Sequence, residues 1–135
     1  MRIVARAIIV TTGVVALIGS ALAADMTGAD IKALVMGKTV YLETTAASLT
    51  GKVGQSVLYF SEDGTVLNKT PDGAIWHGKW EFKANTSCTA WKEKPDSPCT
   101  RWDKTGDAVT ILDASGQLRA KVVKIEPGNA EKLVP

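Results

Sequence analysis

The sequence has one histidine and two cysteines among 135 residues, and this scarcity argues against several kinds of functional site. A structural zinc site needs about four ligands, more than these three residues supply. A redox-active cysteine pair is usually spaced C-x-x-C, whereas ten residues separate Cys88 from Cys99. His77 as a lone general base would need an oriented nucleophile, and the sequence suggests none. We therefore expect no metal centre and no catalytic residue.

Recognisable catalytic motifs are also absent. The sequence contains no G-x-S-x-G, no P-loop, no dinucleotide fingerprint and no H-E-x-x-H. Acidic residues mostly stand at predicted turns, as Asp63 and Asp72 do before glycine, so turn chemistry explains them without general acid–base pairs. The sequence predicts a protein that is not an enzyme and has no cofactor. A small β-barrel hydrolase or isomerase, whose groups converge from distant segments, is the alternative.

Only one long apolar run occurs, and it lies near the N-terminus. Arg2 and Arg6 accompany its start, and it ends in the small-residue motif Ala-Leu-Ala at 21–23. This order is typical of a secretory signal peptide and is too short for a stable membrane span. We expect residues 1–23 to be a signal peptide, cleaved at the end of this motif or after Ala24. An uncleaved N-terminal anchor is the other interpretation.

Charge of one sign is nowhere concentrated in the mature chain, residues 24–135. Without Arg2 and Arg6, the 16 basic residues become 14, equal to the 14 acidic ones. Because both signs are interspersed, we expect no nucleic-acid partner. Because the only long apolar run belongs to the predicted signal peptide, we also expect no stable membrane span after cleavage. The remaining length is enough for a single domain with one core. The predicted signal peptide implies that this domain is located in the periplasm or secreted.

One short helix is predicted at the start of this domain. Thr27 is a good N-cap, and Asp30 three residues later completes a sequence that resembles a capping box. Ile31 and Val35 fall on one helical face, and Gly37 supplies a stop. We expect two to three turns with one apolar stripe.

The remaining sequence alternates with a period of two, which is typical of strands. Short turn signals separate most of the segments, so neighbours in sequence should pair antiparallel. The predicted fold class is therefore all-β: a small antiparallel meander barrel of about eight strands, calycin-like or lipocalin-like, with one short N-terminal helix. A barrel of this size can close on side chains or on one small ligand. The predicted strands are 39–44, 55–61, 65–69, 74–83, 86–92, 99–103, 108–113 and 117–125.

The four tryptophans are predicted to share one face of this sheet. Residues 74–83 place aromatic residues on one face and mostly charged residues on the other. A tight turn at 84–85 would set Gly78 opposite Trp91. The shared face is either a tryptophan-rich core or a partly open aromatic pocket. Its members would be Trp76, Trp80, Trp91 and Trp102.

The near-repeat in "CTAWKEKPDSPCTRW", residues 88–102, is interpreted as a stapled hairpin. An exported protein meets an oxidising compartment, where Cys88 and Cys99 should form a disulfide. Closing this loop contributes about 3 kcal/mol to stability. Each tryptophan lies three residues beyond its cysteine, so Trp91 and Trp102 should face away from the disulfide.

Several ordered segments resemble a family of small proteins exported by proteobacteria. They are "GKTVYLET" at 37–44, "LYFSEDGTV" at 58–66, "GKWEF" at 78–82, a cysteine-containing strand, and "PGNAEKL" at 127–133. The resemblance implies a periplasmic, calycin-like β domain of uncharacterised function. It transfers no catalytic residues.

These observations together predict a non-enzymatic binding domain. Its partner would be a small apolar or aromatic ligand, since small barrels bind ligands where aromatic and polar groups converge. Alternatively, it would be a periplasmic protein that binds an exposed apolar patch, an edge strand or loop 92–98. The expected ligand-binding residues are Trp76, Trp80, Trp91 and Trp102.

Overall fold

The computed structural model of the chain describes residues 22–135. Nearly all of the predicted signal peptide, including Arg2 and Arg6, lies outside the described residues. Cleavage at 23 or 24 therefore stays a prediction. Within 22–135, no helix is both long enough and apolar enough to span a bilayer.

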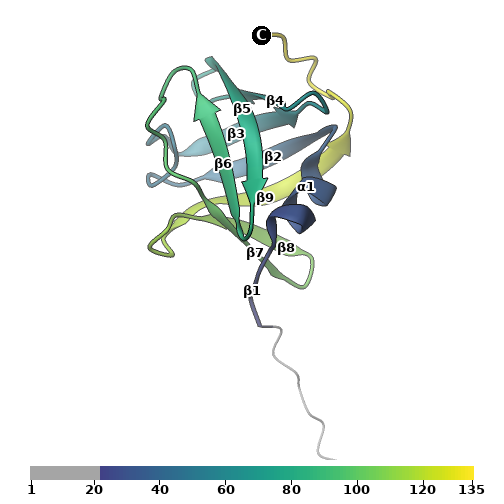
Figure 1. The fold of residues 1–135 in the computed structure, drawn as a ribbon. Helices are drawn as coiled ribbons and strands as arrows, with labels where there is room; N and C mark the ends of the chain where they lie inside the picture. Colours follow the sequence, from purple (N-terminus) through teal and green to yellow (C-terminus); the bar gives the residue numbers. More distant parts are fainter. Residues whose placement is uncertain (1–21) are drawn as a thin grey trace, which may run out of the picture.

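The described residues form one antiparallel sheet of nine strands and one helix (Figure 1). The strands stand side by side in the order β1-β7-β8-β9-β2-β3-β4-β5-β6. This confirms the all-β class and each of the eight predicted strands; the two-residue β1 was not predicted. The elements are β1 (Ala24–Asp25), α1 (Gly28–Val35), β2 (Lys38–Thr44), β3 (Gly54–Phe60), β4 (Thr65–Lys69), β5 (Ile75–Lys83), β6 (Thr86–Trp91), β7 (Arg101–Thr105), β8 (Ala108–Leu112) and β9 (Leu118–Pro127).

The sheet curls until it is barrel-like, because its first and last long strands pair. β2 pairs with β9 along its whole length, from Lys38 opposite Pro127 to Thr44 opposite Ala120. On the other side of the curl, β6 and β7 share a single bridge within 22–135, at Ser87 and Thr100, whose N–H groups each donate to the other's carbonyl at 2.8 Å. We call this contact between β6 and β7 the seam.

β1 covers the edge of β7 beyond the seam. Asp25 lies opposite Asp103, and the Met26 N–H donates to the Trp102 carbonyl at 2.8 Å. The Arg101 guanidinium also donates to the Asp25 carboxylate at 2.7 Å. The edge of β7 is thus partly satisfied by the segment that precedes the helix.

The inner face of the curl holds the core, and Gly78 is essential to its packing. The predicted turn at 84–85 is present, so Gly78 lies opposite Trp91 as expected. A Cβ atom on Gly78 would lie 2.7 Å from Thr89 Cγ2 and 2.9 Å from Trp91 Cε3. The lack of a side chain therefore lets Trp91 pack across β5.

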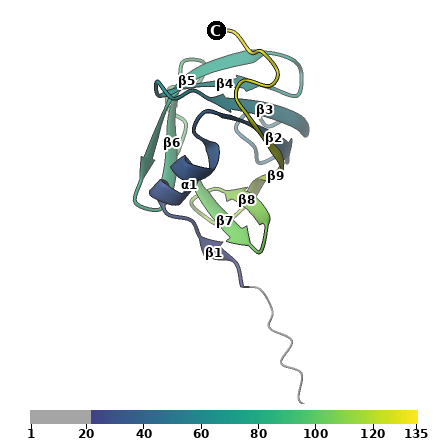
Figure 2. The same ribbon diagram turned by 90° about the vertical axis from the view of Figure 1, so that its right-hand side faces the viewer.

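Helix α1 covers one end of the curled sheet (Figure 2). Its predicted capping box is present: Thr27 Oγ1 accepts from the Asp30 N–H, and Asp30 accepts from the Thr27 N–H. Ile31 and Val35 are fully buried. These two side chains close that end of the core.

The C-terminal segment after β9 packs on the outer face of the sheet. Leu133 is buried there with Tyr41, Val57 and Leu67. The Thr39 hydroxyl donates to the Gly128 carbonyl at 2.7 Å. A second, smaller apolar cluster therefore fixes the end of the chain.

Candidate functional site

A cavity of about 100 Å³ lies inside the curl. Helix α1 precedes β2 and loop 45–53 follows it, so the helix and this loop lie at opposite ends of that strand (Figure 1). Leu49 from loop 45–53 and Pro98 from loop 92–100 line the cavity. The cavity therefore extends from the core to the loops at the end opposite the helix.

The wall of the cavity combines apolar and polar side chains. Its apolar part includes Leu42, Leu58, Phe60, Trp91, Trp102 and Ile111. Its polar part includes Thr44, Ser56, Asn68, Thr89, Thr100 and Arg119. A mostly apolar wall with a few placed polar groups is the usual composition of a small-molecule site.

The structure places all four predicted tryptophans in or against the core cluster, and two of them line the cavity. Trp91 and Trp102 are 7% and 2% exposed and contribute to the wall. Trp76 packs edge-to-face on Trp91, with ring centroids 6.2 Å apart. Trp80 lies against Phe82, with ring centroids 5.1 Å apart. Trp76 and Trp80 are therefore packing neighbours rather than wall residues.

None of the polar wall residues was predicted, and Asn68 and Arg119 show why. Asn68 lies on the same face of β4 as the buried Val66, so alternation along that strand would have found it. Arg119 follows a different rule, because a bulge between β8 and β9 sets its direction. In a regular strand it would point away from its inward neighbour Ala120.

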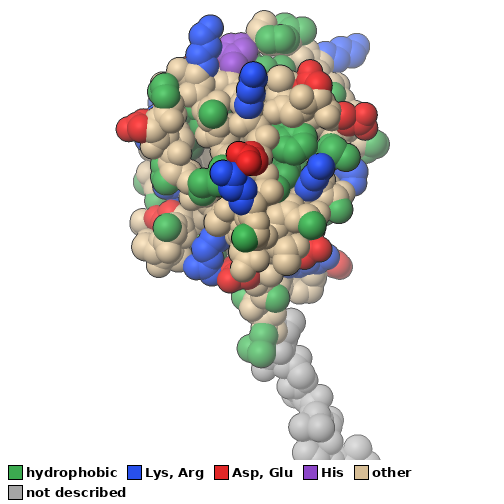
Figure 3. Space-filling view, viewed as in Figure 1, with side chains coloured by type: hydrophobic (Ala, Val, Ile, Leu, Met, Phe, Trp, Pro, Cys, Tyr) green, Lys and Arg blue, Asp and Glu red, His purple; other side chains and the backbone are tan. Residues whose placement is uncertain are grey.

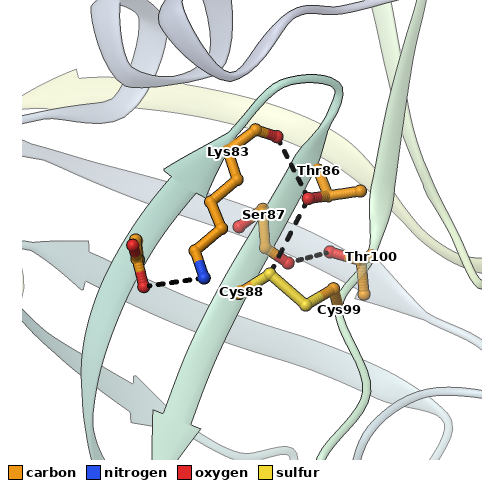
Figure 4. The surroundings of a disulfide bond; sticks show 7 residues. Lys83, Thr86, Ser87, Cys88, Cys99 and Thr100 are labelled. Carbon is orange, nitrogen blue, oxygen red and sulfur yellow. Dashed lines mark hydrogen bonds and ion pairs between the residues drawn. A yellow bond between two sulfur atoms is a disulfide. The ribbon is translucent and has the colours of Figure 1, made fainter.

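The disulfide between Cys88 and Cys99 is present, as predicted (Figure 4). Its two cysteines are the immediate neighbours of Ser87 and Thr100, which form the only bridge across the seam within 22–135. Ser87 and Thr100 line the cavity, whereas Cys88 and Cys99 do not. The covalent bond and the bridge thus hold β6 against the start of β7 at one point. The predicted hairpin is therefore wrong, because β6 pairs with β5 and β7 pairs with β8 instead of with each other.

A pair of acidic side chains lies outside the cavity, where β1 meets β7. Arg101 donates a hydrogen bond to Asp25 and thereby holds the pKa of Asp25 below its usual value. The neighbouring Asp25 raises the pKa of Asp103. None of these three residues lines the cavity.

His77 lies on the outer face of β5, as expected, and is paired with Glu93. Its Nδ1 is 2.6 Å from Glu93 Oε1, and its backbone N–H donates to the same carboxylate. Burial raises the pKa of Glu93, but the hydrogen bonds from His77 lower it. Their combined effect is larger, so the pKa lies below its usual value. Within 22–135, no three His, Cys, Asp or Glu side chains are grouped so as to hold a metal ion.

Charge does not mark a separate binding surface on the face shown in Figure 3. Basic and acidic side chains are interspersed there, with apolar side chains between them. Electrostatic recognition of an extended polyanion needs basic side chains gathered on one face. The cavity is the better-defined candidate site.

No protein-family model, curated protein or solved structure matches the chain. The resemblance to exported proteobacterial proteins and the periplasmic or secreted location therefore stay predictions. A function has to be inferred from the cavity and the residues around it.

Proposed function

We propose that this protein is a non-enzymatic binding protein of the periplasm or the extracellular space, which holds a small ligand inside its curled sheet. The observation that supports this function is the cavity of about 100 Å³, with its apolar wall and few polar groups. Apolar side chains supply contact area, and the polar groups orient the ligand. Trp91 and Trp102 contact the ligand, and Trp76 and Trp80 support the wall from behind.

The size of the cavity limits the size of the ligand. An engineered protein cavity of about 150 Å³ takes up benzene. A cavity of about 100 Å³ therefore suits a molecule of about four to six non-hydrogen atoms. The ligand is a small metabolite rather than a lipid or a peptide.

The ionisable groups of the wall favour binding over catalysis. Arg119 is the one wall residue with an ordinarily charged side chain among those the structure describes. A general acid or base needs a pKa near the working pH, whereas a guanidinium stays protonated. The wall thus supplies a fixed charge for recognition.

Native mass spectrometry of the protein, isolated gently from its own host, tests this function. We expect an added small mass that is lost on denaturation. Ala120→Leu should remove the adduct, because Ala120 is buried in the wall and a larger side chain fills the cavity. The control is Ala90→Leu at an exposed position of β6, which should keep it.

The adduct also has to be reproduced with purified components. Melting curves of both leucine variants establish that each is folded. A bare mass for the isolated protein, together with tryptophan fluorescence that does not respond to short alcohols, amides and acids, would contradict the proposed function.

A further inference from the structure

Three residues that line the cavity each have one buried polar atom without a hydrogen-bond partner among residues 22–135. These atoms are Oδ1 of Asn68, Nε1 of Trp102 and Nε of Arg119. All three residues line the same small cavity. Most buried side-chain polar atoms in folded proteins have a partner, so three orphans around one space indicate groups that a ligand satisfies.

Trp80 gives a comparison, because its indole N–H has a hydrogen-bond acceptor within the protein. Its Nε1 donates to the Ser61 carbonyl at 2.9 Å. Trp102 is more deeply buried, at 2% exposed, yet its Nε1 has no acceptor. The indole N–H of Trp102 is therefore a donor that the protein itself does not satisfy.

A β-bulge brings Arg119 to the same cavity. Leu112 pairs with Leu118 and Ile111 pairs with Ala120, so Arg119 is an extra residue with no partner on β8. Bulges re-aim side chains and are common beside functional sites. Here the bulge makes both Arg119 and its neighbour Ala120 wall residues.

Among the described residues, the positive charge of Arg119 has no carboxylate in ion-pair contact, although it lies near enough to Asp113 to help lower the pKa of that carboxyl. Arg119 forms no ion pair within residues 22–135. Asp113 at the neighbouring turn binds Ser115 and the Gln117 N–H instead. A partly buried guanidinium without a directly bonded carboxylate favours an anionic ligand.

The two N–H donors and the fixed charge specify the head of the ligand, and the apolar wall specifies its body. A carboxylate accepts from both Arg119 and Trp102 and carries one negative charge. Leu58, Phe60 and Ile111 offer the remaining wall to carbon atoms. A phosphate, with further charged oxygens, would face these apolar side chains at a large desolvation cost.

We propose that the ligand is a short-chain monocarboxylate. Its carboxylate accepts hydrogen bonds from Arg119 Nε and Trp102 Nε1, and its chain packs on Leu58 and Ile111. Asn68 Oδ1 is an acceptor, so a carboxylate does not satisfy it, and the assignment rests on the two N–H donors. This assignment rests on the proposed function and names the ligand class for the same cavity.

The test uses butanoate and its neutral isostere butanamide as probes. Each is titrated to about 10 mM, since ligands of this size bind weakly, while the four tryptophan indole N–H signals are followed by ¹⁵N NMR. Single Trp→Phe variants assign the signals. We expect butanoate to shift the Trp102 signal at concentrations at least tenfold lower than butanamide requires. The Trp80 signal should not shift, because its N–H already donates to the Ser61 carbonyl.

Arg119→Gln should abolish the tenfold preference for the acid. Lys121→Gln is the matched control, because it removes an exposed positive charge two residues away on β9. The titration of the unmodified protein needs no variant, so the proposal remains falsifiable if Arg119→Gln does not fold.

Each outcome separates the ligand class from the proposed function. Equal binding of acid and amide, with both shifting Trp102, overturns the carboxylate assignment and leaves a small-ligand binder. Butanoate binding that leaves the Trp102 signal unmoved, or that survives Arg119→Gln unchanged, also overturns the assignment. If neither probe binds and the isolated protein carries no adduct, both proposals fail.

Discussion

Buried polar side chains in this protein fall into two kinds, according to whether the fold satisfies them. The Thr39 hydroxyl, fully buried, donates to the Gly128 carbonyl and accepts from the Ala130 N–H. Asn68 and Arg119 each have a buried atom without a partner. Such an atom costs about 1–3 kcal/mol. Of the four such atoms within 22–135, three belong to wall residues, where a ligand can offset the cost, and the fourth, Asp103 Oδ1, belongs to a residue outside the cavity.

The carboxylate of Asp72 makes stability depend on pH at the cavity end of the sheet. Asp72 accepts hydrogen bonds from Lys52 Nζ and from Thr70 Oγ1, and these hold its pKa at about 2. Since the pKa in the folded state lies below the ordinary value of 3.8, the stabilisation is complete above that value and is lost as the pH falls through 2.

We therefore expect Asp72→Asn to lower the melting temperature at about pH 6, and the difference from the unmodified protein to shrink as the pH is lowered toward 2. Thermal unfolding followed by circular dichroism measures it. Asp107→Asn, at an exposed turn, is the control and should melt like the unmodified protein. Equal melting of Asp72→Asn and the unmodified protein at about pH 6 would show that this carboxylate stabilises nothing.

Residue-level prediction succeeded where alternation alone decides the direction of a side chain. The inward direction of Trp91 and the close approach to Gly78 follow from one two-residue turn, which the sequence marks. The direction of Arg119 does not follow, because the bulge depends on how β9 pairs with β8. The pairing of Asp72 with Lys52 joins two loops, and no local pattern encodes it.

Among the strand pairs, the seam is the weakest contact in the curl. β2 pairs with β9 along all seven of its residues, with one register shift, whereas β6 and β7 share one bridge at Ser87 and Thr100. The disulfide between Cys88 and Cys99 lies beside that bridge. The covalent bond therefore reinforces the place with the fewest hydrogen bonds between neighbouring strands.

Replacing both cysteines by serine should lower the free energy of unfolding by about 3 kcal/mol, because the unfolded chain regains the freedom of the closed loop. Denaturant unfolding measures this change. Amide exchange should locate it, with the largest acceleration at the Ser87 and Thr100 N–H groups and, along β2, only the acceleration that follows from the lower global stability. An unaltered unfolding midpoint would refute the stabilising role of the disulfide.

Element-level prediction worked for the helix and the eight longer strands, because their periodicity and turn residues are local. β1 was not predicted, because two residues are too few to show an alternating pattern and their pairing with β7 is set by tertiary contacts. The fate of the C-terminal segment escaped for the same reason: Leu133 finds its apolar partners on strands far away in sequence.

For the molecule as a whole, the meander was predictable but its interior was not. Short connections imply antiparallel neighbours, and the structure has them. The pairing of β2 with β9, and a cavity instead of a filled core, depend on how side chains from opposite walls meet. Asn68 on β4 and Trp102 on β7 line one space although 34 positions separate them in the chain.

The architecture of the seam also bears on proteolysis. Loop 92–100 joins the two edges of the seam, and the disulfide spans the same gap. A protease that nicks this loop between Lys92 and Ser97 would leave two fragments, β1–β6 and β7–β9, linked through Cys88 and Cys99. They would also stay paired through β2 with β9 and β1 with β7.

The nicked protein should keep its circular dichroism spectrum. On a denaturing gel it should migrate as one species without reductant and as two fragments with reductant. Loss of the spectrum on nicking would show that the intact loop is required. Retention would mark this loop as the place where a circularly permuted chain can begin and end.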